Sequence, residues 1–328
     1  MPQPRTVVAL PPGPGRLPTE RYGRYVDRLS AARTRVLVSP LPEALVVGEL
    51  RNILLAGIRR NPRVELVDDV EAADFVLLDF RHILDGPPLR TDPDRTIIVD
   101  YRDPVKPLLA HDAAWYFKRS VVDQVERRFC DYDRPVTPIG YCVKDDYLDR
   151  GSPAERTRDI DVSVFFEPQS DAAARNLYRS RVARVVRDEY RQRRVFVGIA
   201  GSAGALGRNF FQSQYFEIMA HSKVVVTCNP DRWEGDYRLF EAISSGALVI
   251  SDEMLTPVVH PFIDHEHLVA YDRNDLRTLT SAIDRMLDDE RLRSAIAQRG
   301  YEHAMRYHTT TNRIDEILDT VGFQSNRP

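Results

Sequence analysis

The sequence predicts an α/β protein in which two domains follow one another, each with a parallel sheet covered by helices. Three observations lead to this fold class. Short apolar runs of strand length alternate with segments of helical spacing. The alternation stops at a proline-rich, charged stretch over 133–159 and then starts again. The chain has 328 residues, which is long for one domain and suits two.

The first domain is assigned to residues 1–150. Residues 1–33 are proline-rich and then charged, so we expect a loose arm followed by a surface helix. The apolar runs that predict buried strands are 35–40, 63–69, 73–80 and 96–103. A helix is expected over 43–60, because its apolar residues share one face: Leu50, Ile53, Leu54 and Ile58.

The second domain is assigned to residues 151–328. Its expected strands are 160–168, 193–201, 223–230, 246–252 and 267–272. Its expected helices are 172–190, 209–223, a short one from near Tyr237 to the glycine stop at Gly246, and a helical tail. Open α/β sheets bind ligands beyond the carboxyl ends of their strands. Two such domains that face each other therefore predict a ligand cleft between them.

Composition argues against several classes of protein. The formal net charge is −3, so no nucleic-acid partner is expected. The cysteines, Cys130, Cys142 and Cys228, form no CxxC pair, which disfavours a zinc site and a disulfide framework. No apolar run approaches the ~18–20 residues of a membrane span, and the N-terminal run is too short for a secretion signal. We therefore expect a soluble, cytoplasmic protein.

The most informative stretch is DYRLFEAISSGALVISD (236–252), which reads as a short helix, a glycine stop and a buried strand. The helix N-terminus, with Asp236 and Tyr237, points at the strand-end crevice, where free N–H groups favour a diphosphate. Arg238 adds a planar cation for phosphate oxygens. Glu241, one turn on, can accept hydrogen bonds from the two hydroxyls of a ribose. The structural alternative is an ion pair on a surface helix.

The same string, with the PF, HLVAYD and RGYEHAMRYHTTTNRIDEIL segments that follow it, resembles the donor domain of GT-B glycosyltransferases. These proteins have two Rossmann-like domains with parallel sheets facing a central cleft. The likeness covers roughly residues 195–318. It is nearest to the CgeB-like and exostosin-like groups, through an R-x-x-EA-x-x-x-G core followed by an apolar strand.

The resemblance implies a glycosyltransferase that moves a sugar from a nucleotide-activated donor to a hydroxyl-bearing acceptor, without a metal or another cofactor. Glu241 would hold the donor ribose, and Arg238 with the preceding turn would contact phosphate. We expect Glu241 to be exposed to the crevice, so that Glu241→Ala would weaken nucleotide binding without unfolding the chain. The tail after residue 311 is expected to pack back on the first domain.

The sequence departs from the family at one place. Many retaining members carry two glutamates separated by seven residues, but Trp233 stands eight positions before Glu241, and Glu234 is one place off. Retention and inversion therefore both remain open. Two alternatives also remain: a nucleotide-sugar 2-epimerase on the same fold, and a non-catalytic relic that binds a nucleotide or sugar without transferring it.

Further donor contacts are expected from two other segments. The glycine-rich loop over 198–209 follows a strand, and glycine allows close backbone approach to a base or phosphate, so Gly201 and Ser202 are candidates. Arg181, on the helix after the first strand of the second domain, is a candidate for the donor phosphates. The alternatives are an ordinary flexible loop and a solvated helix face.

Candidates for a general base lie in the first domain, around the carboxyl end of the strand over 96–103. An inverting transfer needs a group that takes the acceptor's hydroxyl proton. The candidates are Asp100, Asp103, His111 and Asp112. An aromatic and basic patch follows, in which Lys118 and Arg119 could instead bind an acidic acceptor or a donor phosphate.

No metal site is expected, although three histidines gather in HPFIDHEHL (260–268). The predicted donor is a UDP- or GDP-sugar. The predicted acceptor is a glycan, a lipid-linked molecule, a natural product or a protein, and the process glycan biosynthesis.

Overall fold

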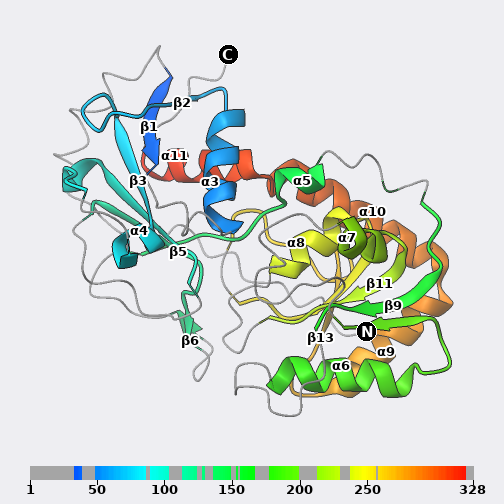
Figure 1. The fold of residues 1–328 in the computed structure, drawn as a ribbon. Coiled ribbons are helices and arrows are strands. Elements are labelled where there is room, and N and C mark those ends of the chain that lie inside the picture. The colour runs from blue at the N-terminus through cyan, green and yellow to red at the C-terminus, as the bar shows by residue number, and fades with distance from the viewer. Residues whose placement is uncertain are drawn as a thin grey trace.

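The computed structural model shows two α/β domains, each built on a parallel sheet, which is the predicted architecture (Figure 1). The structure describes residues 33–38, 49–85, 89–102, 113–123, 128–129, 136–148, 153, 156–166, 177–198, 213–229, 237–255 and 258–322. Within these residues, no helix combines the length and the apolar character that crossing a bilayer requires.

The sheet of the first domain has the strand order β2-β1-β3-β4-β5-β8, and all its pairs are parallel. Its strands are β1 (Thr34–Val38), β2 (Val64–Leu66), β3 (Phe75–Asp79), β4 (Thr96–Asp100), β5 (Trp115–Lys118) and β8 (Thr137–Pro138). Helix α3 (Glu49–Arg60) packs on one face, and α4 (Phe80–Asp85) packs on the other. The 3-10 helix η1 (Pro93–Arg95) precedes β4, and β6 (Val122–Asp123) pairs antiparallel with β7 (Arg128–Phe129).

Strand β5 corrects the interpretation of 115–119 as an aromatic and basic patch. Tyr116, Phe117 and Lys118 are buried, because β5 lies inside the sheet between β4 and β8. Four residues with a lysine at the end are too short and too mixed to stand out as a buried strand. The neighbouring strands, rather than the local pattern, decide this element.

The sheet of the second domain has the order β10-β9-β11-β12-β13, again all parallel. Its strands are β9 (Ile160–Val164), β10 (Val195–Val197), β11 (Ser222–Val226), β12 (Leu248–Asp252) and β13 (Val269–Tyr271). Its helices are α6 (Leu177–Glu189), α7 (Ser213–Ala220), α8 (Tyr237–Ser244), α9 (Leu276–Asp288) and α10 (Glu290–Tyr307). Helices α6 and α9 share one apolar cluster with the sheet, and α7 and α8 share the cluster on the opposite face (Figure 1).

The strand order places the crevice of the second domain. After β9, the chain adds β10 on one side of it and then β11, β12 and β13 on the other side. The direction in which strands are added therefore reverses between β9 and β11. Ligands of open α/β sheets bind beyond the carboxyl ends of the strands at such a switch point. Helix α8 is the next helix after β11 and therefore belongs to this crevice.

The chain crosses between the domains twice, along two segments that run side by side. On the way out, Ile139 packs in the core of the first domain, whereas Val143 packs in that of the second. On the way back, the His308 carbonyl accepts a hydrogen bond from the Val143 N–H at 2.7 Å, and Val143 and Thr309 form a parallel bridge.

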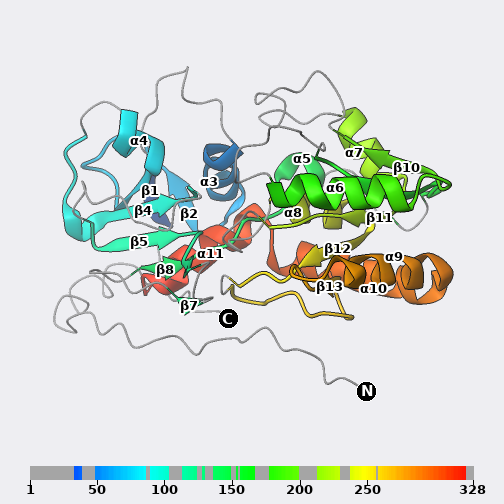
Figure 2. The same ribbon diagram turned by 90° about the horizontal axis from the view of Figure 1, so that it is seen from below.

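The helix next to each crossing packs on the other domain: α5 comes before the second domain but packs on it, and α11 comes after the second domain but packs on the first. Helix α5 (Asp145–Leu148) precedes residue 150, yet its Tyr147 packs in the second domain. Helix α11 (Thr310–Thr320), red in Figures 1 and 2, packs beside α3. Its apolar residues complete the core of the first domain: Ile314, Ile317 and Leu318.

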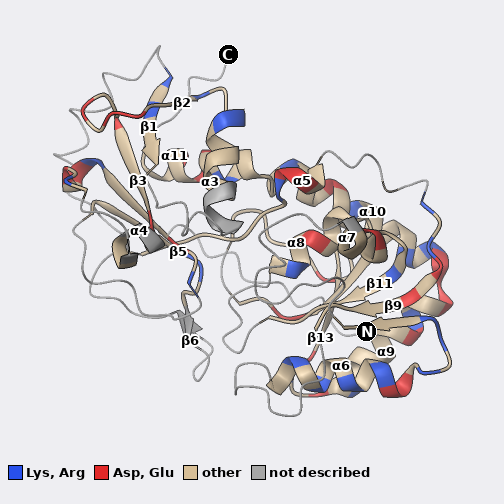
Figure 3. Cartoon of the chain, viewed as in Figure 1, with Lys and Arg blue, Asp and Glu red and all other residues tan. Residues whose placement is uncertain are grey.

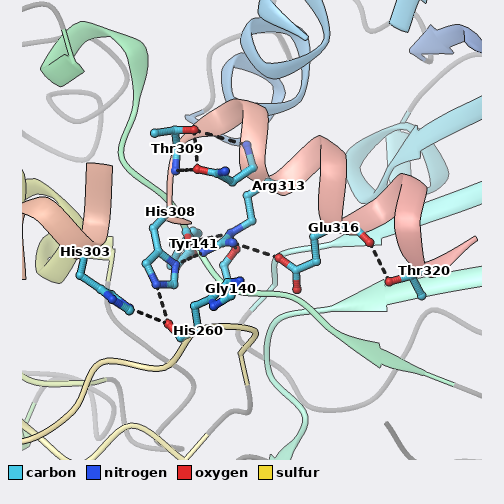
Figure 4. A network of polar contacts seen from close by, with 10 residues as sticks. Gly140, Tyr141, His260, His303, His308, Thr309, Arg313, Glu316 and Thr320 are labelled. Carbon is cyan, nitrogen blue, oxygen red and sulfur yellow. Dashed lines mark hydrogen bonds and ion pairs between the residues drawn. The ribbon is translucent and has the colours of Figure 1, made fainter. Parts of the chain in front are cut away.

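Arg313 joins the two crossings through a buried set of polar contacts (Figure 4). Its Nε donates to the carbonyls of Gly140 and Tyr141, each at 3.0 Å, and Nη2 donates to the Tyr141 carbonyl at 2.7 Å. Nη1 donates to Glu316 Oε2 at 2.9 Å. Nη2 also lies 2.6 Å from His308 Nδ1. This single guanidinium therefore fastens the outgoing segment to α11.

Candidate functional site

Helix α8 places its first turn at the switch point of the second sheet. All of its residues are buried, because it lies between β12, α7 and α10. The helix ends as predicted: Gly246 has φ 72°, a left-handed conformation that glycine adopts without steric cost. Tyr237, Arg238 and Glu241 are thus held on one short, rigid element.

Arg238 is anchored at the carboxyl end of β9. Its side chain is only 3% exposed. Its Nε donates to the carbonyl of Phe165 at 3.1 Å, and its Cζ lies 5.8 Å from the centroid of the Phe166 ring. These contacts fix the guanidinium at the junction of β9, β11 and α8, where the sheet topology places a ligand.

Glu241 is buried at 3% exposure, which corrects the expectation of an exposed, crevice-facing side chain. Its Oε1 accepts a hydrogen bond from the Tyr147 hydroxyl at 2.8 Å, and its Oε2 accepts one from the Tyr215 hydroxyl at 2.9 Å. Replacing it by alanine would leave two buried hydroxyls without these acceptors, which costs stability. Glu241→Ala is therefore a poor test of binding alone, and Glu241→Gln is the better substitution.

Tyr237 connects α8 to the outgoing segment between the domains. The Nζ of Lys144 lies 4.6 Å from the centroid of the Tyr237 ring, and both side chains are buried. Tyr141 meets the same ring edge-on at 5.6 Å and stacks on Tyr101 of the first domain at 5.5 Å. Arg119 lies 4.8 Å from the Tyr141 centroid. A row of rings flanked by cations therefore runs from the first domain to the start of α8.

Polar contacts also brace the strand ends beside α8. The Asn229 backbone N–H and side-chain Nδ2 donate to Asp252 Oδ1 at 2.6 and 2.9 Å, which ties the end of β11 to that of β12. Arg273 Nη1 lies 3.0 Å from Asp252 Oδ2, and its Cζ lies 4.0 Å from the Tyr178 centroid. These bonds hold together the ends of β11 and β12, the strands that precede and follow α8 in the chain.

In the first domain, Asp100, one of the candidates for a base, is buried and surrounded by polar partners. The Arg102 backbone N–H and Nε donate to Oδ1, both at 3.0 Å, and the Tyr116 hydroxyl donates to Oδ2 at 2.6 Å. Lys118 Nζ lies 3.3 Å from Oδ2. Burial raises the pKa of Asp100, but Arg102, Lys118 and Tyr116 outweigh it and lower that pKa. A fully buried, weakly basic carboxylate is poorly suited to take a proton from an acceptor.

Two basic residues are also buried: Lys118, at the end of β5, and Arg119, directly after it. Lys118 is fully buried, and burial lowers its pKa to about 8, against the opposing effect of Asp100. Arg119 is likewise buried and donates from Nε to the Tyr101 carbonyl at 3.0 Å. Both side chains therefore brace the carboxyl ends of β4 and β5.

Of the remaining candidates, the structure describes Arg181. Arg181 lies exposed on α6 and has no hydrogen bond or ion pair within the described part of the chain. The others lie outside the described residues: Asp103, His111, Asp112, Gly201, Ser202 and Asp236. For these the predicted roles stay predictions.

Lys144, Tyr147 and Tyr215 contact the candidate residues of α8, and sequence reasoning missed all three. Tyr147 is 94 positions from Glu241, and Tyr215 is 26 positions from it. Lys144 and Tyr147 stand in the stretch interpreted as a linker, and no motif marks them. Only the crossing of the chain between the domains brings them to α8.

The histidines near residue 260 pack against one another and against α10. The rings of His267 and His303 stack at 4.0 Å, and His267 Nδ1 accepts the Ile263 N–H at 3.0 Å. Among the described residues, no three His, Cys, Asp or Glu side chains gather as metal ligands would.

The second domain resembles a known protein family, and the whole fold resembles several solved structures. Residues 170–319 match the model of a family described as glycosyl transferase-like. No curated protein matches the chain. A solved structure of an alpha-glucosyltransferase with UDP and a 13-mer DNA containing an HMU base is 11% identical, with a TM-score of 0.54. The match covers 88% of this chain and 100% of that chain.

Two further structures of an alpha-glucosyltransferase are similar. One, with UDP-glucose and DNA containing an abasic site, is 9% identical, with a TM-score of 0.54, and covers 88% of this chain and 99% of that one. The other, with UDP and a 13-mer DNA containing a central A:G mismatch, is 10% identical, with a TM-score of 0.51, and covers 88% and 98%.

These likenesses confirm the predicted GT-B architecture. The family match, which lies in the second domain, confirms the predicted resemblance of that domain to glycosyltransferases. Neither finding supports the epimerase alternative. The nearer likeness to the CgeB-like and exostosin-like groups stays a prediction.

The comparisons correct one expectation, that of no nucleic-acid partner. Glucosyltransferases of the same fold are in complex with DNA, so a net charge of −3 gives no ground for that exclusion. Binding of a polyanion depends on the local field at the site rather than on the sum over the chain. Charges of both signs share the helices of this protein, as Figure 3 shows for α6 and α8.

Proposed function

We propose that this protein transfers a sugar from a nucleotide-activated donor to a hydroxyl-bearing acceptor, with the donor held at the start of α8. The observation that carries the proposal is the placement of Arg238 and Glu241 on the first turns of α8, at the switch point of the second sheet. The family match over residues 170–319 supports it independently.

In this proposal the donor diphosphate lies against the N-terminal turn of α8. Backbone N–H groups there favour an anion, and Arg238 adds a cation anchored by Phe165. Lys144, over the ring of Tyr237, brings a second buried cation from the segment between the domains. The ribose hydroxyls donate to the carboxylate of Glu241.

The reaction breaks the bond between the sugar's anomeric carbon and the diphosphate oxygen and forms one to the acceptor oxygen. Negative charge grows on the departing diphosphate, so Arg238, Lys144 and the helix N-terminus lower the barrier by stabilising it. We propose that these groups act without a metal. The acceptor's proton passes to a base, for which Asp103, His111 and Asp112 remain the candidates.

The proposal also covers the kind of donor, the sugar, the acceptor and the cellular process. UDP-sugars are the first donors to test and GDP-sugars the second, because alpha-glucosyltransferases of this fold are in complex with UDP and UDP-glucose. A hexose is the proposed sugar. Acceptors to test are glycans, lipid-linked molecules, natural products, proteins and nucleic acids. The proposed process is glycan biosynthesis, in the cytoplasm.

The test measures nucleotide binding and donor consumption separately. Thermal shift with UDP, GDP and their sugars identifies the nucleotide, because a ligand that binds only the folded state raises the melting temperature. Arg238→Met should weaken binding of that nucleotide about 10- to 100-fold, since it removes a charge-assisted contact. Arg277→Met, on the exposed start of α9, is the matched control and should bind normally.

Donor consumption that requires an added acceptor supports the proposal. Consumption of the donor alone, with an isomeric nucleotide sugar as product, would instead indicate an epimerase. Binding without consumption across the whole acceptor panel would indicate a binding protein, and absence of any nucleotide binding would overturn the site itself.

A further inference from the structure

The outer face of α6 and the turn that follows it carry a row of exposed arginines, which we call the basic row. It consists of Arg181, Arg184, Arg187, Arg191, Arg193 and Arg194. Over residues 181–194, these six arginines stand against two acids, Asp188 and Glu189, so the local net charge is +4. The whole chain has a net charge of −3, so this segment differs strongly in charge from the rest (Figure 3).

Most of the basic row is not neutralised by carboxylates. Arg187 pairs with Asp188 at 2.9 Å, and Arg194 pairs with Asp159 at 2.7 Å. The side chains of the other four arginines make no hydrogen bond or ion pair within the described part of the chain. The helical part of the row places its arginines three residues apart, where side chains are neighbours and like charges repel. An anionic partner would relieve this repulsion.

The inner face of α6 is already occupied, so the helix is a fixed support for the basic row. Val182, Ala183 and Val186 are fully buried in the apolar cluster that α6 shares with the sheet. Of the large apolar side chains of α6, only Leu177, at its first position, is exposed. Helices that bind a membrane surface bury an apolar face in it, and α6 has no such face to offer.

Helix α9 limits the width of the basic row. It runs beside α6, and Asp284 of α9 accepts a hydrogen bond from the Tyr190 hydroxyl at 2.9 Å. The exposed charges of α9 have both signs: Arg277, Asp284, Arg285 and Asp288. A flat anionic membrane on the row would also meet these carboxylates. A linear polyanion can instead follow a row that is one helix wide.

The spacing of the basic row suits the phosphates of a nucleic-acid duplex. A helix rises about 1.5 Å per residue, so Arg181 and Arg187 lie about 9 Å apart along α6, and the row continues past its end to Arg194. Each strand of a duplex carries one phosphate per about 3.4 Å of its axis. The planar fork of arginine suits phosphate oxygens. Tyr178 and Tyr190 are buried, so neither ring is available for a base to stack on.

We propose that the basic row is a docking surface for the phosphate backbone of double-stranded nucleic acid. Contacts to the backbone carry no sequence information, so binding is independent of base sequence. Helix α6 packs on the opposite face of the second sheet from α8. The surface is therefore separate from the donor site, and the inference does not depend on the proposed function.

The test measures the anisotropy of a labelled DNA duplex of about 20 base pairs and mixed sequence, between about 50 and 200 mM salt. If each unpaired arginine neutralises one phosphate, the slope of log affinity against log salt is about −3.6, a loss of about 100-fold over this range. Replacing Arg184, Arg191 and Arg193 together by glutamine should reduce the size of the slope by about 2.7. Each single replacement should reduce it by about 0.9, so the test does not depend on the triple variant.

The matched control replaces three exposed arginines of α9 and α10 by glutamine: Arg285, Arg291 and Arg306. It changes the net charge by the same amount and should keep the wild-type slope. Equal losses in the two triple variants would show that only the overall charge matters and would overturn the inference. Absence of duplex binding by the wild-type protein at about 50 mM salt would also overturn it.

Vesicles of equal parts phosphatidylserine and phosphatidylcholine test the other anionic surface. Binding to these vesicles without binding to the duplex would assign the basic row to a membrane and overturn the inference. Thermal shift with UDP and GDP, measured on the same variants, reports on the donor site alone. Loss of duplex binding with an unchanged nucleotide shift supports a separate docking surface.

Discussion

Replacing Arg313 by methionine should destabilise the whole chain, because this side chain joins both crossings between the domains. Methionine keeps most of the length and volume of the side chain and removes the charge and the donors. Arg313 is 1% exposed. The change leaves the buried carboxylate of Glu316 without its ion pair and removes the donors to the Gly140 and Tyr141 carbonyls.

The magnitude follows from these lost contacts. Removing one partner of a buried ion pair costs about 3–5 kcal/mol. At about 2.1 cal/mol/K per residue, unfolding of 328 residues carries an entropy of about 0.7 kcal/mol/K. A loss of about 4 kcal/mol then lowers the melting temperature by about 6 °C if the chain unfolds as one unit.

Differential scanning calorimetry measures this shift and shows whether the domains still unfold together. Arg313→Met combined with Glu316→Gln should recover part of the loss, because the double variant buries no unpaired carboxylate. Arg277→Met is the control: that side chain is 90% exposed in its pair with Asp275, and surface pairs contribute under about 1 kcal/mol. A fall of less than about 2 °C for Arg313→Met would refute the reasoning.

Two further predictions concern the seam between the domains, by which we mean the two crossing segments and the contact of α11 with α3. Gly57→Ala should destabilise the contact of α3 with α11 by about 1–3 kcal/mol, because the new Cβ would collide with the Thr310 carbonyl and lie 2.7 Å from Ile314 Cγ1. Thermal unfolding measures the loss of stability. Arg59→Ala, on the exposed side of α3, is the control and should change the melting temperature little. Acid should also weaken the seam, since burial and then Arg313 lower the pKa of His308 to about 2, below the value of about 6.5 expected in the unfolded chain. The unfolded chain therefore binds a proton first as the pH falls, and stability present above about pH 6.5 is lost below it, by about 2 kcal/mol for this group between pH 7 and 5. Urea unfolding at the two pH values should show that His308→Asn has a smaller loss than the wild-type protein; an equal loss would place the titration elsewhere.

The fold class could be predicted from the sequence because its signals are local. β3 and β4 are apolar on both faces, since helices cover both sides of a parallel sheet, and such runs stand out from the polar turns around them. The start and stop of α8 are likewise local. The glycine at 246 adopts the left-handed conformation that ends the helix, and Arg238 and Glu241 lie one turn apart whatever surrounds them.

The chemical state of each side chain was not predictable, because it depends on neighbours that are distant in sequence. Asp100 looked like a base at a strand end, but Arg102, Tyr116 and Lys118 surround it once β5 enters the sheet. Glu241 looked exposed because an amphipathic pattern does not show what covers a helix. Tyr147 covers it only because the chain crosses between the domains before α5.

The sequence by itself therefore determined the two-domain α/β class, the apolar strands of both sheets that stand out locally, and the turn that carries Arg238 and Glu241. Each of these follows from residue spacing over a few positions. Tertiary structure alone decided which charges are buried, which are paired and which side chains reach α8 from elsewhere. Burial and pairing set the free energy of a charge, and both are properties of the surroundings that folding assembles.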